Sequence, residues 1–445
     1  MFYLNRETEL TADLLSKMIN KFRVDVEPRL QKYKNYYDGE QAILKKSYAD
    51  ESKPCNRTVI NYCKSITDGY SGYTAAAGCI SYSSSEDITD IMEIMRYNDY
   101  QEEDSAFMTD LLLYGTAAEL MYMDSDSKVR FKLINPLQCF AIFDDSLTND
   151  LLYFVRIYKA DEWNDSNTYI VDVYGETTLK RYELQGESGL PIFKEELPQY
   201  FSQCPANVAY MPDEKSVFDC ILTQQDAINE LVSAEIDDYS AFCDAYLALE
   251  GVDADSEDIA AMKENRVLIL PENAKAYWVT KNANSAQVES IKKDLHESIY
   301  RTAQSPDFSS ESFVGGVSSG IAIQYRLTGM ETRAATICAP FKKALQRRIE
   351  IIAGVKSLLL GEEVYRDIKI NFKRNIPADE AQVVTVVNGL KGTVSDKTLL
   401  GQVPFVEDVE AELVALQEQK SANMALYDFG GSFTSKEEEN SEADE

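Results

Sequence analysis

The sequence is poor in the residue types from which most enzyme sites are built. It has one histidine, His296, and none of its 20 glycines is followed by lysine. A P-loop needs Gly-Lys followed by Ser or Thr to hold phosphates, so the pattern excludes a P-loop ATPase. A single histidine also has no partner for a histidine-based metal site or a hydrolase triad. We therefore expect His296 at a helix surface or an interface.

Paired cysteines and long apolar runs are also missing. The eight cysteines are scattered and include no C-x-x-C pair, which favours free thiols over a disulfide framework or a zinc site. The longest apolar candidate, 111–123, is about half the ~20 residues of a membrane span and contains Glu119. The N-terminus is polar and does not look like a signal peptide. These features predict a soluble, intracellular protein that does not associate with membranes.

Positive charge is scarce: 44 Lys and Arg stand against 75 Asp and Glu, a net charge of −31. This argues against a conventional nucleic-acid reader, which needs a basic surface to displace counterions from phosphates. The imbalance is local as well. Residues 216–262 contain no Lys or Arg and twelve acidic residues, whereas 326–373 carry ten basic residues against five acidic ones. The chain therefore has one strongly acidic and one basic stretch.

At 445 residues the chain is long enough for more than one compact unit. Its apolar periodicities predict an α+β fold that is mainly helical. Residues 55–215 read as a mixed unit, preceded by an amphipathic helical segment. Its predicted strand runs are VRFKLI, FAIFDD, LLYFVRIYK, TYIVDVYG and TLKRYEL, and two more strand-like runs, RVLILP and KAYWVTK, lie between 251 and 283. Helices are predicted over 1–50, 56–69, 87–115, 216–247, 284–306, from Gly320 onward with a kink at Pro340, 378–391, 395–400 and 405–425, followed by a disordered acidic tail at 431–445. The helix from Gly320 carries a near-heptad seam for packing against other helices, formed by Ile323, Leu327, Met330, Ala334, Ile337, Phe341 and Leu345.

One segment spells a hydrolase motif. Gly316, Ser318 and Gly320 form G-x-S-x-G, the pattern of a nucleophile elbow. That elbow requires a buried strand before the serine and a histidine after it, but here a polar stretch precedes the serine and His296 lies upstream. We interpret the segment as a flexible glycine-rich loop.

Carboxylate pairs leave a metal-dependent reaction as an alternative. Asp144-Asp145 and Asp237-Asp238 could contribute to a two-metal nuclease site. We favour a turn for the first pair and a solvated helix face for the second. An EF-hand-like spacing that starts at Asp253 has Asp258 where the loop needs glycine. We therefore expect no metal and no cofactor.

The basic stretch has two interpretations. Arg326, Arg333 and Arg347 are spaced by whole heptads along the long predicted helix. They could approach DNA phosphates, or they could pair with carboxylates of neighbouring helices, within or between subunits. In a chain this acidic the second arrangement is the more economical, and both remain open.

Several segments, in order along most of the chain, resemble the portal proteins of tailed bacteriophages, in the branch typical of long-tailed phages of Gram-positive hosts. They are YYDGEQ, NRTVINYCKSITDGYSGY, GTAAELMYMDSDSKVRFKLINPLQCFAIFDD, NVAYMPDEKSVFDCILTQQDAINELVSAEIDDYSAFCDAYLALEG, SPDFSSESFVGGVSSGIAIQYRLTGMETRA, VSDKTLL and FVEDVEAELVAL. Each segment alone is a weak signal, and the ordered set is fairly specific.

The resemblance implies a non-enzymatic subunit of a ring, usually dodecameric, through which double-stranded DNA passes at one capsid vertex during packaging and ejection. By similarity, the regions are a helical N-terminal segment (1–54), wing (55–215), first stem helix (216–250), clip (251–283), second stem helix (284–306), tunnel loop (307–320), long kinked wing helix and strand (321–375), crown (376–430) and acidic tail (431–445).

The same resemblance implies sites and partners. The DNA-facing tunnel loop would comprise Ser312, Phe313, Val314, Gly315, Gly316, Val317, Ser318 and Ser319. An acidic stem face would comprise Asp226, Glu230, Glu235, Asp237 and Asp238. Expected partners are other copies of the chain, DNA without sequence preference, the terminase large subunit, the head–tail adaptor, and the major capsid and scaffolding proteins. The protein would reside in the virion and, during assembly, in the host cytoplasm. The alternatives are a metal-dependent nuclease or phosphotransferase and an acidic scaffold or adaptor protein.

Overall fold

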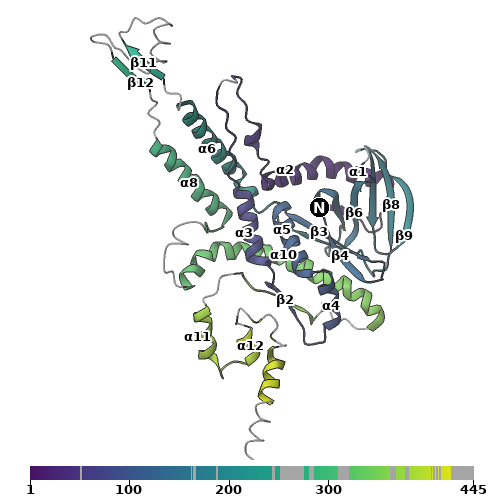
Figure 1. Ribbon diagram of the computed structural model, residues 1–445. Coiled ribbons are helices and arrows are strands. Elements are labelled where there is room, and N and C mark those ends of the chain that lie inside the picture. Colours follow the sequence, from purple (N-terminus) through teal and green to yellow (C-terminus); the bar gives the residue numbers. More distant parts are fainter. Residues whose placement is uncertain are drawn as a thin grey trace, which may run out of the picture. The chain divides into compact units, whose positions relative to one another are not determined.

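The computed structural model of the chain is shown in Figure 1. It describes residues 1–50, 53–161, 163, 167–186, 189–242, 246–250, 275–279, 285–308, 320–360, 367–375, 380–401, 403, 406, 409 and 412–421. These residues fall into two compact units, Met1–Arg374 and Asn375–Glu445. Within the described ranges, none of the helices has the length and apolar character needed to cross a membrane.

The largest sheet of the first unit has six strands in the order β1-β5-β6-β7-β8-β9. Neighbouring strands are antiparallel except β1 and β5, which run parallel. The strands are β1 (Phe2–Leu4), β5 (Cys139–Asp144), β6 (Leu151–Lys159), β7 (Thr168–Tyr174), β8 (Thr178–Gln185) and β9 (Ile192–Pro198). The predicted strand runs from FAIFDD to TLKRYEL are confirmed as β5 to β8.

The N-terminal helical segment covers one face of this sheet (Figure 1). The cover consists of α1 (Ala12–Lys21) and a π-helical turn (Phe22–Val26), and α2 (Glu27–Asp38), which follows, packs mainly against other helices. Leu15, Ile19 and Phe22 share a core with sheet residues that include Phe140 and Val171. The prediction of helix is confirmed here and wrong for the first residues, which form β1. A three-residue strand is too short to show a periodicity, and its partner β5 is far away in the sequence.

A second sheet packs on the opposite face. It has the antiparallel order β10-β3-β4, with β10 (Ala206–Tyr210), β3 (Thr116–Met123) and β4 (Val129–Ile134). Ala118 and Leu120 of β3 share a core with Ala141 and Phe154 of the large sheet.

The predicted single helix over 87–115 is wrong in one respect, because it is two helices, α4 (Thr89–Tyr97) and α5 (Tyr100–Tyr114). Asn98 separates them and anchors the break on β4. Its side-chain oxygen accepts the amide of Phe131 at 3.1 Å, and its side-chain nitrogen donates to the carbonyl of Val129 at 3.1 Å. Asp99 then takes a positive φ of 50°, which no helix interior allows.

Two neighbouring helices, α6 (Leu222–Phe242) and α8 (Ser285–Ala303), run antiparallel to each other, and α6 lies in the acidic stretch. Between them in the sequence, β11 (Tyr246–Glu250) and β12 (Lys275–Val279) form an antiparallel pair. Both predicted helices are confirmed, and so is the predicted strand KAYWVTK, which contains β12. The other predicted run, RVLILP, lies outside the described residues. The prediction of helix up to residue 247 is wrong because Tyr246 already pairs with β12, a contact that local propensity does not encode.

The longest element is α10 (Gly320–Leu360), which begins at the predicted residue. Its predicted seam is confirmed by burial: Leu327, Met330, Ala334, Ile337, Phe341 and Leu345 are all at most 4% exposed. Pro340 lies inside the helix and does not end it. Helix α3 (Tyr62–Ala75) packs against α10 and α5. The helix predicted over 56–69 is confirmed from Tyr62 onward and wrong for 56–61, whose backbone amides bond to side chains of α6 instead. The short strands β2 (Ile80–Ser83) and β13 (Lys369–Phe372) form an antiparallel pair.

The second unit contains α11 (Glu380–Leu390), α12 (Asp396–Leu400) and a further helical stretch over 412–421. Ser395 caps α12, because its hydroxyl accepts the amide of Thr398 at 3.3 Å. The helices predicted at 378–391 and 395–400 are confirmed. The predicted acidic tail lies outside the described residues.

Candidate functional site at the junction of the long helices

An extended segment of the chain lies along α6 and bonds to a row of polar side chains on that helix. The backbone amides of Asn56, Thr58, Ile60 and Tyr62 donate to the side chains of Asp237, Ser233, Asn229 and Gln225, at 2.6, 3.0, 2.9 and 3.1 Å. Four helical residues rise about 6.0 Å and two extended residues span about 6.6 Å, so every second amide meets every fourth helix residue. We call this set of four bonds the amide ladder.

The amide ladder is buried and closed by further bonds. Gln225, Asn229 and Ser233 have no solvent exposure, and Asp237 is 8% exposed. Asn229 also donates to the side chain of Gln41 at 2.6 Å. The ladder was not predicted, although hydrogen-bonding side chains at every fourth position of an expected helix are a signal that could have found it.

Lys46 supplies a cation to the acidic helix. Its ammonium nitrogen lies 3.2 Å from Glu230 and 3.3 Å from Asp237. Burial by itself would lower the pKa of Lys46, but hydrogen bonds with Tyr48, Glu230 and Asp237 raise it above its ordinary value. Burial by itself would raise the pKa of Asp237, but bonds from Asn56 and Lys46 lower it below its ordinary value. Asp237 is thus held ionised, and its predicted place on a solvated helix face is wrong.

The other predicted stem acids also have partners within the chain. Asp226 accepts the hydroxyl of Tyr36 at 2.8 Å, and Glu235 forms an ion pair with Lys292 of α8. Asp238 is exposed and likewise has an interaction partner. A helix without a single Lys or Arg is therefore partly neutralised by lysines from two other segments.

Arg333 of α10 ties the ends of two other segments to the long helix. One guanidinium nitrogen donates to the carbonyl of Ala303, the last residue of α8, at 2.8 Å. The other donates at 2.5 Å to the carbonyl of Val217, which precedes α6. The hydroxyl of Tyr70 in α3 also donates to Ala303, and the guanidinium lies over the Tyr70 ring. A cation at a helix C-terminus complements the unpaired carbonyls there.

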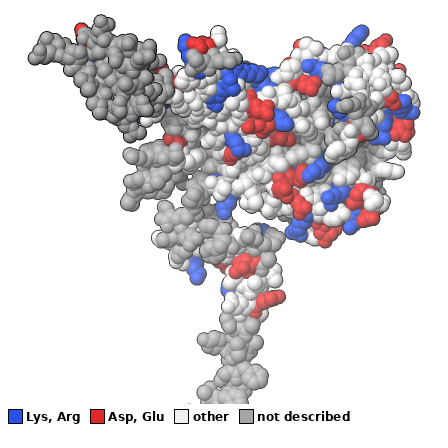
Figure 2. Space-filling model, turned by 45° about the horizontal axis from the view of Figure 1, so that its top comes forward, with Lys and Arg blue, Asp and Glu red and all other residues white. Residues whose placement is uncertain are grey.

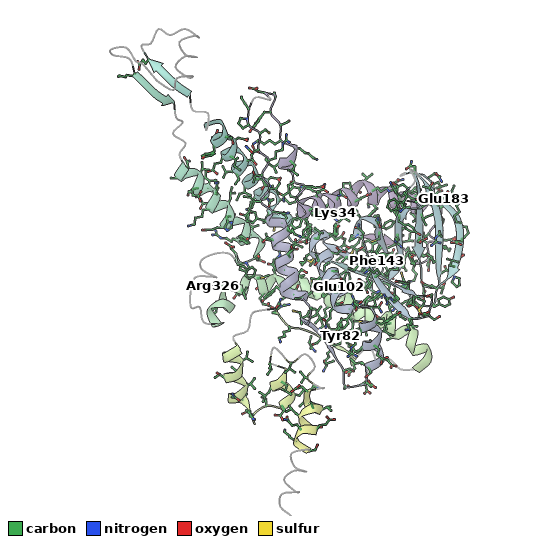
Figure 3. All side chains as sticks on the ribbon, in the orientation of Figure 1. Lys34, Tyr82, Glu102, Phe143, Glu183 and Arg326 are labelled. Carbon is green, nitrogen blue, oxygen red and sulfur yellow. The ribbon has the colours of Figure 1, made fainter. Side chains whose placement is uncertain are left out.

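The other two predicted arginines have different surroundings. Arg347 donates to the carbonyl of Ala206 at 3.3 Å and to the side chain of Gln203 at 3.4 Å. Arg326 is exposed near the N-terminal end of α10 and has an interaction partner (Figure 3). Arg333 and Arg347 therefore use their donors on carbonyl oxygens of their own chain. Their predicted contacts with DNA or with another subunit stay predictions.

A buried ion triad fixes the middle of α10. Arg348 has no solvent exposure and pairs with Glu119 of β3 at 2.6 Å and with Asp104 of α5. The Tyr82 hydroxyl donates to Asp104 at 3.2 Å, and the guanidinium lies 4.5 Å from the centre of the Phe131 ring. Burial disfavours the charge on Arg348, but the two carboxylates outweigh it and raise its pKa. Burial raises the pKa of both acids in spite of the guanidinium.

The sequence carries a signal for this triad. Arg348 follows Leu345 by three residues and so continues the buried seam of α10. Glu119 interrupts an apolar run. A charged residue at a core position of each of two elements indicates that the two pair in the interior.

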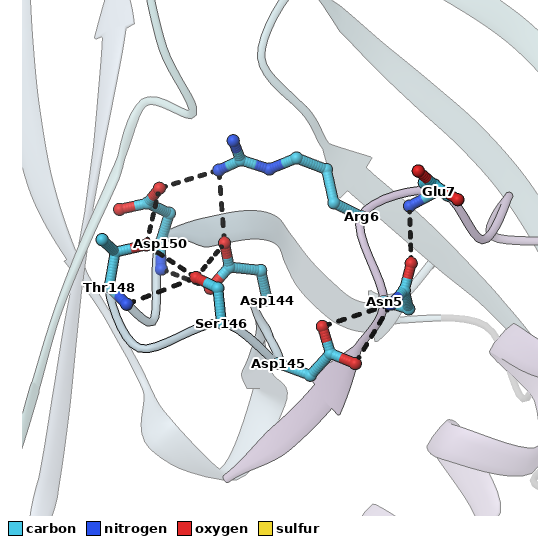
Figure 4. Close-up of polar contacts among 8 residues, drawn as sticks. All are labelled: Asn5, Arg6, Glu7, Asp144, Asp145, Ser146, Thr148 and Asp150. Carbon is cyan, nitrogen blue, oxygen red and sulfur yellow. Dashed lines mark hydrogen bonds and ion pairs between the residues drawn. The ribbon is translucent and has the colours of Figure 1, made fainter.

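The first carboxylate pair proposed for metal chemistry belongs to a turn, as predicted (Figure 4). Asp144 accepts the amide of Asp150 and the hydroxyl of Ser146, at 2.8 and 2.9 Å, and pairs with Arg6 at 3.3 Å. Asp145 accepts the side-chain amide of Asn5. These carboxylates fasten the β5–β6 turn to the N-terminal segment. In the parts of the chain that the structure describes, no cluster of three or more His, Cys, Asp or Glu residues could hold a metal ion.

The predicted tunnel loop, Ser312 to Ser319, lies outside the described residues, and with it Ser318. The surface charge can be followed on one face of the molecule, where Lys and Arg side chains alternate with Asp and Glu side chains (Figure 2). The seven described cysteines are all free, as expected.

The described site consists of structural junctions: a ladder, an arginine tie and a buried triad, each holding a long helix to the rest of the unit. These features are those of a structural protein, in which side-chain contacts hold long helices in fixed positions. A family model described as phage portal protein, SPP1 Gp6-like, matches residues 23–425, and the chain belongs to this family. Portal proteins are structural proteins, so the nuclease or phosphotransferase alternative is set aside.

Two curated relatives agree with the family. The portal protein of Bacillus phage SPP1 is 20% identical over 421 residues, which cover 87% of this chain and 80% of that protein. A portal protein of Clostridium phage phiCD119 is 26% identical over 141 residues, which cover 32% of this chain and 30% of the relative.

Proposed function

We propose that the chain assembles into a ring, of twelve subunits, that forms the DNA conduit at one vertex of a phage capsid. The observation that carries this proposal is the family match, which runs from residue 23 to residue 425 and so includes the amide ladder, the arginine tie and the buried triad. In this role the ring admits DNA during packaging, connects head to tail and releases DNA on ejection. The protein acts in the virion and assembles in the host cytoplasm.

The regions are assigned as follows. Residues 55–215 are the wing, α6 and α8 the two stem helices, and 251–283 the clip. The connection after Pro306 is the tunnel loop and α10 the long wing helix, while 376–430 form the crown. The clip contacts the terminase large subunit and later the head–tail adaptor, and the crown faces the capsid interior. The major capsid and scaffolding proteins are further partners of the ring. The extended helices α6, α8 and α10, and their mutual ties, support this assignment.

The acidic stem gives the conduit a surface that does not bind DNA tightly. A basic lining would hold the duplex by releasing its counterions, whereas carboxylates repel phosphates and let the duplex slide. Asp226 and Asp237 are engaged inside the subunit, so the face offered to DNA consists of Glu230, Glu235 and Asp238. The first two side chains are 58% and 42% exposed in spite of their lysine partners.

Native mass spectrometry of the purified chain, together with negative-stain images, tests the proposal. The expected result is a closed ring with a central channel. A compact species that stays monomeric under assembly conditions would count against it, and would favour the acidic scaffold or adaptor alternative.

The assignment of the tunnel loop has its own test. Deletion of 315–319 is expected to leave ring assembly intact and to reduce the amount of DNA packaged or retained in heads. If the deletion variant fails to fold, the segment is part of a core and not a loop.

A further inference from the structure

The chain reverses direction directly after α8. Gln304 takes a positive φ of 53°, and the amide of Ser305 donates to the carbonyl of Tyr300 at 3.0 Å, which closes the last turn of the helix. Pro306 follows. The chain then folds back against α8, so that the carboxylate of Asp307 contacts His296, which lies eleven residues earlier in the sequence. The exit from this helix is therefore directed by side-chain contacts as well as by the helix cap.

His296, the single histidine of the chain, bonds to both neighbouring segments at once. Its Nε2 lies 2.9 Å from a carboxylate oxygen of Asp307, and its Nδ1 lies 2.8 Å from the hydroxyl of Tyr62 at the start of α3. The ring also makes edge contacts with the rings of Tyr62 and Tyr300, at centroid distances of 5.6 and 5.1 Å. The imidazole thus connects α3, α8 and the segment that follows α8.

The hydrogen-bond roles in this chain follow from elementary chemistry. An ionised carboxylate only accepts, so Nε2 carries the proton and donates to Asp307. In the neutral ring Nδ1 then accepts the proton of the Tyr62 hydroxyl. If the ring is protonated, Nδ1 donates and the hydroxyl oxygen accepts. Both hydrogen bonds of His296 therefore form whether or not the ring is protonated, and the two neighbouring segments stay linked.

We propose that Tyr62, His296 and Asp307 form a latch that sets the direction in which the chain leaves α8 on its way to α10, and that His296 is a positioning residue for DNA passage. The second part rests on the proposed function, in which this connection faces DNA. Tyr62 is also the last rung of the amide ladder, so the latch and the ladder share one residue. The position of the segment that follows α8 is therefore fixed relative to α6 as well as to α3.

Hydrogen exchange and DNA packaging test the latch with four variants of the full-length protein. His296→Phe keeps an aromatic ring and removes both hydrogen bonds, and Asp307→Ala removes the outer one. Asp307→Asn keeps an acceptor for Nε2 and serves as the conservative rescue. Tyr37→Phe is the matched control, since it deletes a tyrosine–carboxylate bond of 2.7 Å, to Asp68, on another face of α3.

We expect peptides that span 304–308 to exchange about fivefold to tenfold faster in His296→Phe and Asp307→Ala, as the loss of a bond worth about 1 kcal/mol allows. Asp307→Asn and Tyr37→Phe should exchange like the parent protein. The two disruptive variants should form rings and package less DNA. Unchanged exchange in His296→Phe, or an equal packaging defect in Tyr37→Phe, overturns the latch. If the parent protein forms no ring, the proposed function fails while the exchange result still decides on the latch.

Discussion

A guanidinium nitrogen of Arg348 lies 2.6 Å from a carboxylate oxygen of Glu119, and neither side chain has any solvent exposure. The two residues are 229 positions apart in the sequence, so this pair fixes the register of α10 against β3. The interaction of opposite charges inside a protein is offset by the cost of removing both from water. The pair therefore contributes more to the uniqueness of the arrangement than to net stability.

The triad makes a prediction about single and combined substitutions. Arg348→Met leaves two buried acids without a cation and should lower the free energy of unfolding by about 3–5 kcal/mol. Replacing Arg348 by Met, Asp104 by Leu and Glu119 by Leu together removes all three charges and should cost less than Arg348→Met alone. Denaturant unfolding measures both values.

Arg347→Met serves as the control for this series, because the neighbouring arginine bonds to a carbonyl and a side-chain amide instead of a buried carboxylate. It should cost about 1 kcal/mol. A triple variant that is less stable than Arg348→Met would contradict the argument. It would mean that packing shape, and not charge, dominates this part of the core.

The amide ladder predicts a graded loss along α6. Asn229→Ala removes the acceptor of the buried Ile60 amide, and it also deletes one hydrogen bond each of the Gln225 and Gln41 side chains. The loss should cost about 1–3 kcal/mol. Ser233→Ala removes the acceptor of one amide, that of Thr58, and should lower the free energy of unfolding by less than Asn229→Ala does. Thr223→Ala, at an exposed position of the same helix, is the control and should change little. Equal effects of Asn229→Ala and Thr223→Ala would show that the segment is held by other contacts.

Elements with a long apolar periodicity could be predicted from the sequence. The seam of α10 from Leu327 to Leu345, the strands β5 to β8 and the helices α6 and α8 all carry local patterns of burial. The failures lie where a distant partner decides. Asn98 breaks a helix because its side chain hydrogen-bonds to the backbone of β4, and Phe2–Leu4 forms a strand only because β5 provides an edge.

The same distinction applies to the candidate site. The sequence identified Arg333 and the acids of α6 as unusual, since charge can be counted along the chain. It did not identify their partners, because the carbonyl of Val217 and the ammonium of Lys46 come from segments whose approach depends on the whole fold. The charges of these residues could therefore be predicted from the sequence, whereas the groups that pair with them could not.

Asp110 of α5 predicts a pH dependence of stability. Burial raises the pKa of its carboxyl from 3.8 to about 7. The folded state thus holds the proton more tightly than the unfolded state, so stability is highest below about pH 4 and is lost as the pH rises toward 7. Asp110→Asn removes this loss and should raise the free energy of unfolding at pH 8 by on the order of 1–3 kcal/mol, less than the full linkage value because some solvent reaches the side chain.

Unfolding curves of the parent protein and Asp110→Asn at pH 5 and pH 8 measure the effect as a difference of differences. Asp126→Asn, in the exposed β3–β4 turn, is the matched control and should show the same gap between the two proteins at both pH values. If Asp110→Asn stabilises equally at pH 5 and pH 8, the carboxyl does not titrate between them and the argument from burial is wrong.

Gly115 predicts a large effect of one methyl group. It ends α5 with a positive φ of 75°, and a Cβ atom there would lie 2.5 Å from the amide nitrogen of Lys215. Gly78 also has a positive φ, of 81°, but a Cβ atom at that position meets no other atom within 4 Å. Gly78→Ala should therefore cost about 1 kcal/mol from backbone strain alone. Gly115→Ala adds a clash with backbone and should cost about 1–3 kcal/mol more.

The difference between the two glycine variants isolates the close approach of the segment before α6 to the end of α5. That contact matters because the carbonyl of Val217, two residues beyond Lys215, is the one that Arg333 holds. Gly115→Ala should consequently weaken the arginine tie as well as the local turn, and Arg333→Met should cost less in the Gly115→Ala background than in the parent protein. Additive losses in denaturant unfolding would show that the turn and the arginine tie are independent.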